Sequence, residues 1–300
     1  MRCDVKIISK TGLEREQIVD KVIKGSDSFE IHLTNENMAS LYKNIGKYLA
    51  FINEFNMKIE AIHSPICCGY DIEDLTTNYK RIEDVFFLAD EMGKFQNKVI
   101  PVIMHMDYNL RAFEKFGKEK EIVKRLNTLL NIYSHSNASI ENLVAFGNNN
   151  KRLCVKTNCD ASAPEFAEYF NKKTGKSIGT VLDTCHMLMS IEHLEKYKDD
   201  FPYESIYSIE DYIRKFIKTL NIVHLSNMRG NGIGYKYHAT PFETDSEISL
   251  LEEIMKLLYN YGYNGIITLE LSEEDYANTK NWLIVRDNLY KAARKLKIKI

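Results

Sequence analysis

Short apolar segments rich in β-branched residues alternate with longer segments of helical periodicity along the whole chain. This alternation limits the fold more than any other feature, because near-continuous apolar runs are typical of strands covered on both faces. We predict strands at residues 3–8, 29–33, 58–63, 99–105, 138–141, 177–183, 222–225 and 265–270. We predict helices at residues 15–23, 40–55, 78–94, 119–133, 164–173, 209–220, 248–261 and 282–296.

Eight strands that alternate with eight helices predict parallel strands, and the number of units favours a closed barrel over an open sheet. The chain has 300 residues but only five prolines, and no linker or drop in hydrophobicity divides it. We therefore predict an α/β fold, a single (β/α)8 TIM barrel domain over residues 1–300. Enzymes with this fold carry their active sites at the C-terminal ends of the strands.

Bulk composition excludes several classes of protein. The formal net charge is −2, which gives no sign of a nucleic-acid or membrane binder. The first residues, MRCDVKIISK, lack the apolar core of a signal peptide, and no apolar run is long enough to span a bilayer. The six cysteines form no CxxC pair, which argues against a structural zinc site. We expect a cytoplasmic protein without a membrane partner, and a homo-oligomer is compatible with the sequence.

Residues that can bind metal follow the predicted strands. Residues 179–187 read GTVLDTCHM, which places Asp183 and His186 where the sixth strand should end. A carboxylate and an imidazole at one strand end can hold a divalent cation. Five further apolar runs end in residues of the same type: His63, His105, Glu141, His224 and Glu270.

Taken alone, a histidine at a strand end is more often a hydrogen-bonded structural residue than a ligand. Buried carboxylates such as Glu141, Asp183 and Glu270 are different, because each needs a cation or several donors. Three carboxylates at one barrel mouth would repel one another unless a metal neutralised them. Oxygen and nitrogen ligands without thiolate suit Mn²⁺, Zn²⁺, Co²⁺ or Mg²⁺, so we predict a divalent metal cofactor.

The sequence pieces IHSPI, VIMHMD, IENL, LDTCH, VHLSNMRG and ITLEL together resemble the xylose-isomerase-like TIM barrel superfamily. This superfamily includes endonuclease IV (AP endonuclease family 2) and the sugar phosphate isomerases and epimerases. The resemblance implies one metal held by four residues: Glu141, Asp183, His224 and Glu270. It also implies a second metal site of the endonuclease type on His63, His105 and Glu141.

The third metal of the endonucleases uses the histidine of the LDTCH piece and an Asp-x-His pair. Here His186 and His238 match, but Lys236 stands at the aspartate position, and an ammonium has no lone pair for a metal. We therefore expect no third metal. Arg229 nearly matches an epimerase arginine that contacts substrate oxygens, although its spacing is one residue short. The expected substrate-binding residues are His186, Arg229, Lys236 and His238.

Two enzymatic functions follow from the resemblance. The first is a metal-dependent isomerase or epimerase of a sugar or sugar phosphate, in which Glu141 and Glu270 act as base and acid through an enediolate. The second is a metal-dependent phosphodiesterase at abasic sites in DNA, which His63 and His105 favour and Lys236 opposes. A third alternative is an inactive barrel that serves as a binding module. We favour the isomerase, whose partner is a small sugar. Residues 188–208 are expected to form a long loop that could serve as a lid, a dimer contact or neither.

Overall fold

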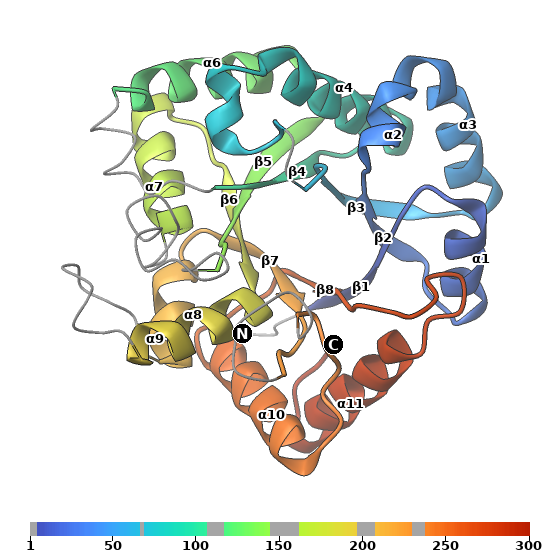
Figure 1. The fold of residues 1–300 in the computed structure, drawn as a ribbon, viewed down its shortest axis with the longest axis vertical. Coiled ribbons are helices and arrows are strands. Elements are labelled where there is room, and N and C mark those ends of the chain that lie inside the picture. The colour runs from blue at the N-terminus through green and yellow to red at the C-terminus, as the bar shows by residue number, and fades with distance from the viewer. Residues whose placement is uncertain (1–4, 67–68, 107–116, 145–161, 197–207, 230–237) are drawn as a thin grey trace.

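The computed structural model of the chain describes residues 5–66, 69–106, 117–144, 162–196, 208–229 and 238–300. The strands form a closed parallel barrel in chain order, in which β1 pairs with both β2 and β8 (Figure 1). This arrangement confirms the predicted (β/α)8 barrel. The strands are β1 (Lys6–Thr11), β2 (Ser28–His32), β3 (Lys58–His63), β4 (Ile100–His105), β5 (Ser136–Glu141), β6 (Gly179–Asp183), β7 (Leu220–Leu225) and β8 (Ile266–Leu269).

Helices surround the barrel on its outer side (Figure 1). Their apolar stripes pack on the outward faces of the strands in one continuous hydrophobic cluster. The helices are α1 (Arg15–Ile23), α2 (Asn35–Ala39), α3 (Leu41–Glu54), η1 (Ile72–Thr76), α4 (Tyr79–Gln96), α6 (Glu119–Ile132), α7 (Ser162–Thr174), α8 (Thr184–Lys196), α9 (Ile209–Phe216), α10 (Asp245–Asn260) and α11 (Asn281–Leu296).

A second, smaller apolar cluster fills the inside of the barrel. It joins Ala61, Ile103, Val181 and Ile222 from four strands, with Ile266 packed against them. Because β4 and β6 are not neighbours in the sheet, these side chains can meet only across the barrel interior. Side chains alternate between the two faces of a strand, so a residue two positions later points into the barrel again. This small apolar layer is therefore the floor beneath the C-terminal strand ends.

Two register shifts adjust which residues face each other near that end. One lies between β2 and β3 at Phe29 and Glu30, and the other lies between β6 and β7 at Thr180 and Val181. Beyond the second shift, Asp183 stands opposite His224 in the ladder. Irregularities of this type re-aim side chains beside active sites.

The first strand lies later in the sequence than predicted. It spans Lys6–Thr11, whereas the apolar run suggests residues 3–8, of which the first two lie outside the described part of the chain. The prediction is wrong at this point because its polar residues Ser9, Lys10 and Thr11 read as the end of the strand. Lys10 can nevertheless be buried, since carboxylates on neighbouring strands neutralise its ammonium.

The long loop expected at residues 188–208 is helical up to Lys196, within α8. Leu188 and Ile191 pack against the hydrophobic core, which explains why a segment rich in charge still folds as a helix. Residues 197–207 lie outside the described part of the chain. Among the helices of the described ranges, none combines the length and the apolar character needed to cross a membrane.

Candidate functional site

Three of the candidate metal ligands converge because each follows a floor residue by two positions on the same strand. His63 follows Ala61, Asp183 follows Val181, and His224 follows Ile222. The strict alternation of a strand therefore turns all three side chains into the barrel, one layer above the floor. The structure brings four of the predicted residues together, with one potential ligand atom from each within 4.8 Å of the others: Glu141, Asp183, His224 and Glu270.

The hydrogen bonds of His224 determine which of its ring nitrogens is available. Its Nε2 lies 2.9 Å from Oε2 of Glu30, which as a carboxylate can only accept a proton. In the neutral ring, Nδ1 therefore carries a lone pair. This nitrogen lies 2.6 Å from Oε2 of Glu270 and 3.3 Å from Oε1 of Glu141. A lone pair that faces two carboxylate oxygens is repelled, so Nδ1 of His224 needs either a proton or a metal cation between itself and these oxygens.

Two buried oxygens of the group support the same conclusion. Oδ1 of Asp183 accepts the backbone N–H of His186 at 2.8 Å, whereas Oδ2 of Asp183 has no hydrogen-bond partner among the described residues. Oε2 of Glu270 is also buried, and within the described ranges its one close polar neighbour is Nδ1 of His224, 2.6 Å away. Unpaired buried carboxylate oxygens are costly, and a divalent cation satisfies them. The residues therefore fit a divalent metal with oxygen and nitrogen ligands.

A second group of three potential ligands adjoins the first and shares Glu141 with it: His63, His105 and Glu141. Nδ1 of His63 lies 2.7 Å from the carbonyl oxygen of Ser64, so it carries the proton. Nε2 of His63 then faces Oε2 of Glu141 at 3.0 Å, and Nε2 of His105 lies 3.4 Å from the same oxygen. The structure thus assembles the second predicted set of ligands.

A third group consists of Asp183, His186 and His238. Nδ1 of His186 donates to the carbonyl oxygen of Asn142 at 2.8 Å, which leaves a lone pair on its Nε2. Nε2 of His238 lies 2.8 Å from that nitrogen. The two rings can share one proton or bind one cation. Lys236, on which the expected absence of a third metal depends, lies outside the described residues.

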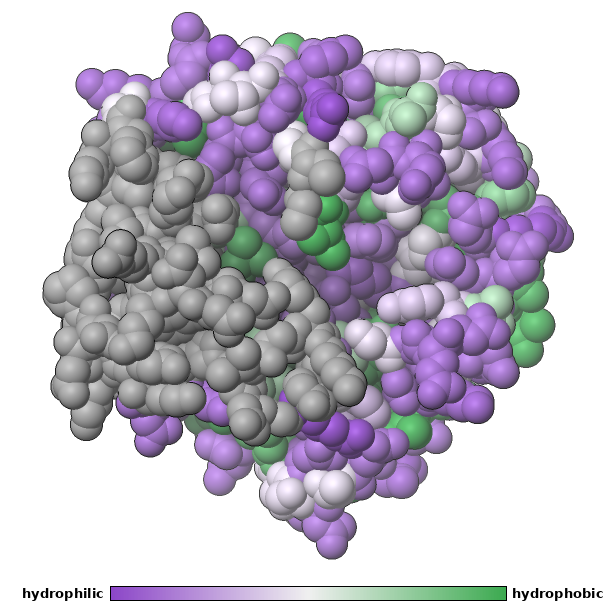
Figure 2. All heavy atoms as spheres, in the orientation of Figure 1, coloured by the Kyte–Doolittle hydropathy of each residue, from purple (hydrophilic) through white to green (hydrophobic). Residues whose placement is uncertain are grey.

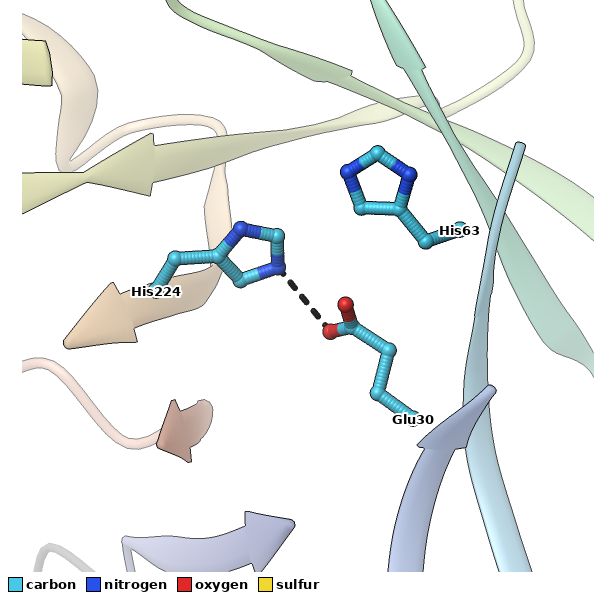
Figure 3. A group of neighbouring side chains, drawn as sticks. All are labelled: Glu30, His63 and His224. Carbon is cyan, nitrogen blue, oxygen red and sulfur yellow. Dashed lines mark hydrogen bonds and ion pairs between the residues drawn. The ribbon is translucent and has the colours of Figure 1, made fainter. Parts of the chain in front are cut away.

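Two charged residues of this site were not among the predicted ones, namely Lys10 and Glu30. Figure 3 shows Glu30 of β2, His63 of β3 and His224 of β7 pointing toward one another, with Glu30 bonded to His224. Oε2 of Glu30 also accepts the hydroxyl of Thr268 at 2.9 Å. The ammonium of Lys10 lies 2.6 Å from Glu270 and 3.4 Å from Glu30. One signal was present in the sequence, because Glu30 interrupts the apolar strand SFEIH.

The charges of the cluster shift the protonation of its members. Burial opposes the ionisation of Glu141, but His224 and His105 outweigh burial and hold the pKa of Glu141 well below its usual value. Burial also opposes protonation of His224, yet Glu30, Glu141 and Glu270 raise its pKa well above the ordinary value. The site is therefore an anionic environment that attracts a proton or a metal cation.

Arg229 lies away from these groups. Its Nε donates to Oε1 of Glu247 at 2.8 Å, and its Nη2 donates to Oε2 of Glu243 at 2.5 Å. Both carboxylates lie near the N-terminus of α10. The guanidinium thus already has two anionic partners, and its expected role in substrate binding stays a prediction.

A cavity of about 430 Å³ adjoins the metal-binding groups at the ends of β1, β2 and β8. Its wall includes Lys10, His32, His238 and Glu270, so a ligand in the cavity can reach the cluster from this side. Outside the grey residues, the face of the molecule seen in Figure 2 is mostly hydrophilic, with small hydrophobic areas. The volume is sufficient for a small molecule of the size of a hexose.

Solved structures with the same fold are similar to this chain at low sequence identity. A 3-keto-D-glucoside 4-epimerase from E. coli has a TM-score of 0.58 at 15% identity, covering 97% of this chain and 100% of that one. A D-tagatose 3-epimerase-like protein has a TM-score of 0.60 at 13% identity, covering 98% of both chains. A xylose isomerase-like protein from Mycobacterium smegmatis, in complex with magnesium, has a TM-score of 0.56 at 12% identity, covering 92% and 87%.

The sequence comparisons give the family itself. No curated protein matches the chain. Residues 24–292, however, match the family described as the xylose isomerase-like TIM barrel, which covers most of the 300 residues. The chain therefore belongs to the xylose isomerase-like TIM barrel family.

Proposed function

We propose that the protein is a metal-dependent isomerase or epimerase of a small ketose. The observation that carries the proposal is the meeting of Glu141, Asp183, His224 and Glu270 within 4.8 Å beside a cavity of hexose size. Two of the similar solved structures are described as epimerases, one of a 3-keto-D-glucoside and one D-tagatose 3-epimerase-like. This similarity supports a sugar substrate.

The reaction needs a base, an acid and a means of acidifying a C–H bond. A divalent cation on the four ligands would polarise two substrate oxygens and lower the pKa of the carbon between them. Glu270 lines the cavity, and Lys10 and His224 outweigh its burial and keep its pKa low, so that its carboxylate is ionised and able to take the proton. Glu141, whose Oε1 lies 3.3 Å from the same nitrogen of His224 that Glu270 contacts, would be the second proton carrier.

The polar residues around the cavity would orient the substrate. His238 lines the cavity, and its Nε2 lies 2.8 Å from Nε2 of His186. We propose that this pair binds substrate hydroxyls. Arg229 and Lys236 remain proposed substrate contacts on the grounds of the resemblance alone.

Exchange of carbon-bound hydrogen tests the proposal directly. The metal-loaded protein is incubated in heavy water with D-fructose, D-tagatose and D-psicose, and the proton next to the ketose carbonyl is followed by NMR. We expect the NMR signal of this proton to disappear with at least one of the ketoses, and only when metal is present. Glu270→Gln should abolish the exchange, whereas Glu60→Gln should not, because Glu60 pairs with Lys6 and Lys98 at the other end of the barrel. Exchange that persists in Glu270→Gln would disprove the acid–base role.

A second function is supported by a separate observation. The groups around His63 with His105 and around His186 with His238 both adjoin the first group, as clustered metals in a phosphodiesterase would require. A phosphodiesterase at abasic sites predicts two or three zinc ions per chain and chelator-sensitive nicking of abasic duplex DNA. An isomerase predicts one metal and no nicking. Metal analysis of the freshly purified protein and the nicking assay decide between the two.

A further inference from the structure

Lys21 is a buried lysine whose ammonium has no hydrogen-bonded or ion-paired partner in the described part of the chain. Its side chain lies on the inner side of α1, and the residue is only 4% exposed. Among the described residues, the ammonium makes neither a hydrogen bond nor a salt bridge, and its one contact of note is the ring of Trp282, 4.8 Å away. Buried ammonium groups without a partner are costly and therefore rare.

Lys21 lies beside the cavity that adjoins the metal-binding cluster. Lys21, Trp282 and Glu270 are all among the residues that line this cavity. The Trp282 ring covers one side of the Lys21 ammonium, and Trp282 is itself only 3% exposed. A charged donor thus stands at the wall of a cavity that also reaches Glu270 of the metal-binding cluster.

The anionic residues near Lys21 are already engaged. Both carboxylate oxygens of Glu273 accept backbone N–H groups at the start of α11, including that of Trp282 at 2.7 Å. Asp20 is held by Lys24 at 2.5 Å and by the hydroxyl of Thr279 at 2.6 Å. Burial lowers the pKa of Lys21 to about 8, and the nearby Glu273 and Asp20 do not compensate for it. The ammonium of Lys21 is therefore available to an anionic ligand in the cavity that it lines.

We propose that the ammonium of Lys21, packed against the Trp282 ring, binds a carboxylate at the end of the substrate remote from the reacting carbon. This inference rests on the proposed function, because that function places the reacting carbon near Glu270. A sugar acid, in which a carboxylate replaces the terminal hydroxymethyl group, has the required chemistry.

The charge of the cavity favours a carboxylate over a phosphate. Glu14 and Glu273 line the cavity, and Lys10 is already paired with Glu270. Among the described residues that line the cavity, the ammonium of Lys21 therefore remains to neutralise a negative charge on the ligand. A carboxylate carries one negative charge, whereas a phosphate monoester carries about 1.5 to 2 at neutral pH. The second charge of a phosphate would lie unpaired beside two further carboxylates.

Three ketoses that differ at one position test the assignment. D-Fructose, D-fructuronate and D-fructose 6-phosphate share the ketone and differ in carrying a hydroxymethyl, a carboxylate or a phosphate at the far end. Their dissociation constants are measured by calorimetry on the full chain loaded with Mn²⁺. We expect D-fructuronate to bind at least tenfold more tightly than the other two.

Variants assign the preference to the ammonium of Lys21. Lys21→Met should weaken D-fructuronate binding about ten- to a hundredfold and leave D-fructose unchanged, because a charge-assisted hydrogen bond is lost. Lys21→Arg keeps the positive charge and should restore part of the preference. The control is Lys47→Met, since Lys47 is exposed and its ammonium lies 5.3 Å from the Phe51 ring.

Three results would overturn the proposal: no preference for D-fructuronate or no binding of it, a preference that survives in Lys21→Met, or tighter binding of D-fructose 6-phosphate. These results are independent of catalysis. If no ketose exchanges deuterium but the carboxylate preference depends on Lys21, the proposed function fails while the binding site stands. If exchange occurs without the preference, the binding site fails alone.

Discussion

Replacing Glu30 by glutamine tests how the protein prepares His224 to bind a metal. Glu30 is fully buried and accepts from Nε2 of His224 and from the hydroxyl of Thr268, both at 2.9 Å. Glutamine keeps the shape, and its amide oxygen can still accept both hydrogen bonds, because both end on the same oxygen, Oε2 of Glu30. It removes the negative charge that makes the opposite nitrogen of His224 a better ligand and that helps to neutralise Lys10.

Outer carboxylate partners of metal-bound histidines are typically worth 10- to 100-fold in metal affinity. The predicted loss for Glu30→Gln therefore corresponds to about 1.4–2.8 kcal/mol of binding free energy. The assay is competition for Mn²⁺ or Zn²⁺ against a fluorescent chelator, with circular dichroism to show that the variant is folded. Glu60→Gln is the control, because it also removes one strand carboxylate from its ion pairs, here those with Lys6 and Lys98.

A Glu30→Gln variant that binds metal within twofold of the native protein would refute this account of the His224 pair. The same holds if Glu60→Gln weakens metal binding equally, because the effect would then follow from a general loss of charge. A variant that is unfolded without metal but recovers both fold and affinity when metal is added would also contradict the expected weakening.

Three further predictions concern Glu270, Lys21 and Lys236, the last of which rests on the sequence alone. Glu270→Gln should remain folded and lose about 100-fold or more in turnover, which single-turnover kinetics would measure on the best substrate. Lys21→Met should raise the free energy of unfolding at pH 7 by on the order of 2–3 kcal/mol, because the buried ammonium has its pKa lowered from 10.5 to about 8. This gain in the free energy of unfolding should shrink between pH 8 and pH 10, because the unfolded chain still binds a proton there that folded Lys21 has lost. Urea titrations of both proteins at pH 8 and pH 10 measure this change. A difference between native and variant protein that is the same at both pH values would show that the pKa shift is absent. Lys236→Asp should raise the number of bound metals by completing a ligand set with His186 and His238, and elemental analysis that finds no increase would contradict this.

The sequence was sufficient for the fold class and for the C-terminal ends of the strands other than β1, to within one residue. Strand β3 spans Lys58–His63 as predicted, because apolar residues and a following Ser-Pro delimit it. Strand β1 was misplaced, since the rule that strands are apolar fails where a lysine is neutralised inside the barrel. Helix α8 was missed in part for a related reason: tertiary contacts of Leu188 and Ile191 outweigh the charge of the segment.

The residues of the candidate site are likewise of two kinds: those that could be predicted from the sequence and those that could not. The ligand-type residues at the strand ends are local features, and alternation along each strand turns them to a common side, so their convergence could be inferred from the chain alone. Glu30 and Lys10 could not be found so, because their importance depends on partners 194 and 260 residues away in sequence. Lys21 could not be found from the sequence either, because its surroundings, such as the ring of Trp282, come from a distant part of the chain.

The sequence by itself determined the alternation of strands and helices and the chemical types of the ligands, since both are set by local periodicity. Only the tertiary structure decided which nitrogen of His224 faces the ligands, which carboxylate holds it, and which lysine is left without a partner. These properties arise from distances between residues far apart in the chain. Closure of the barrel sets those distances, and no single segment contains them.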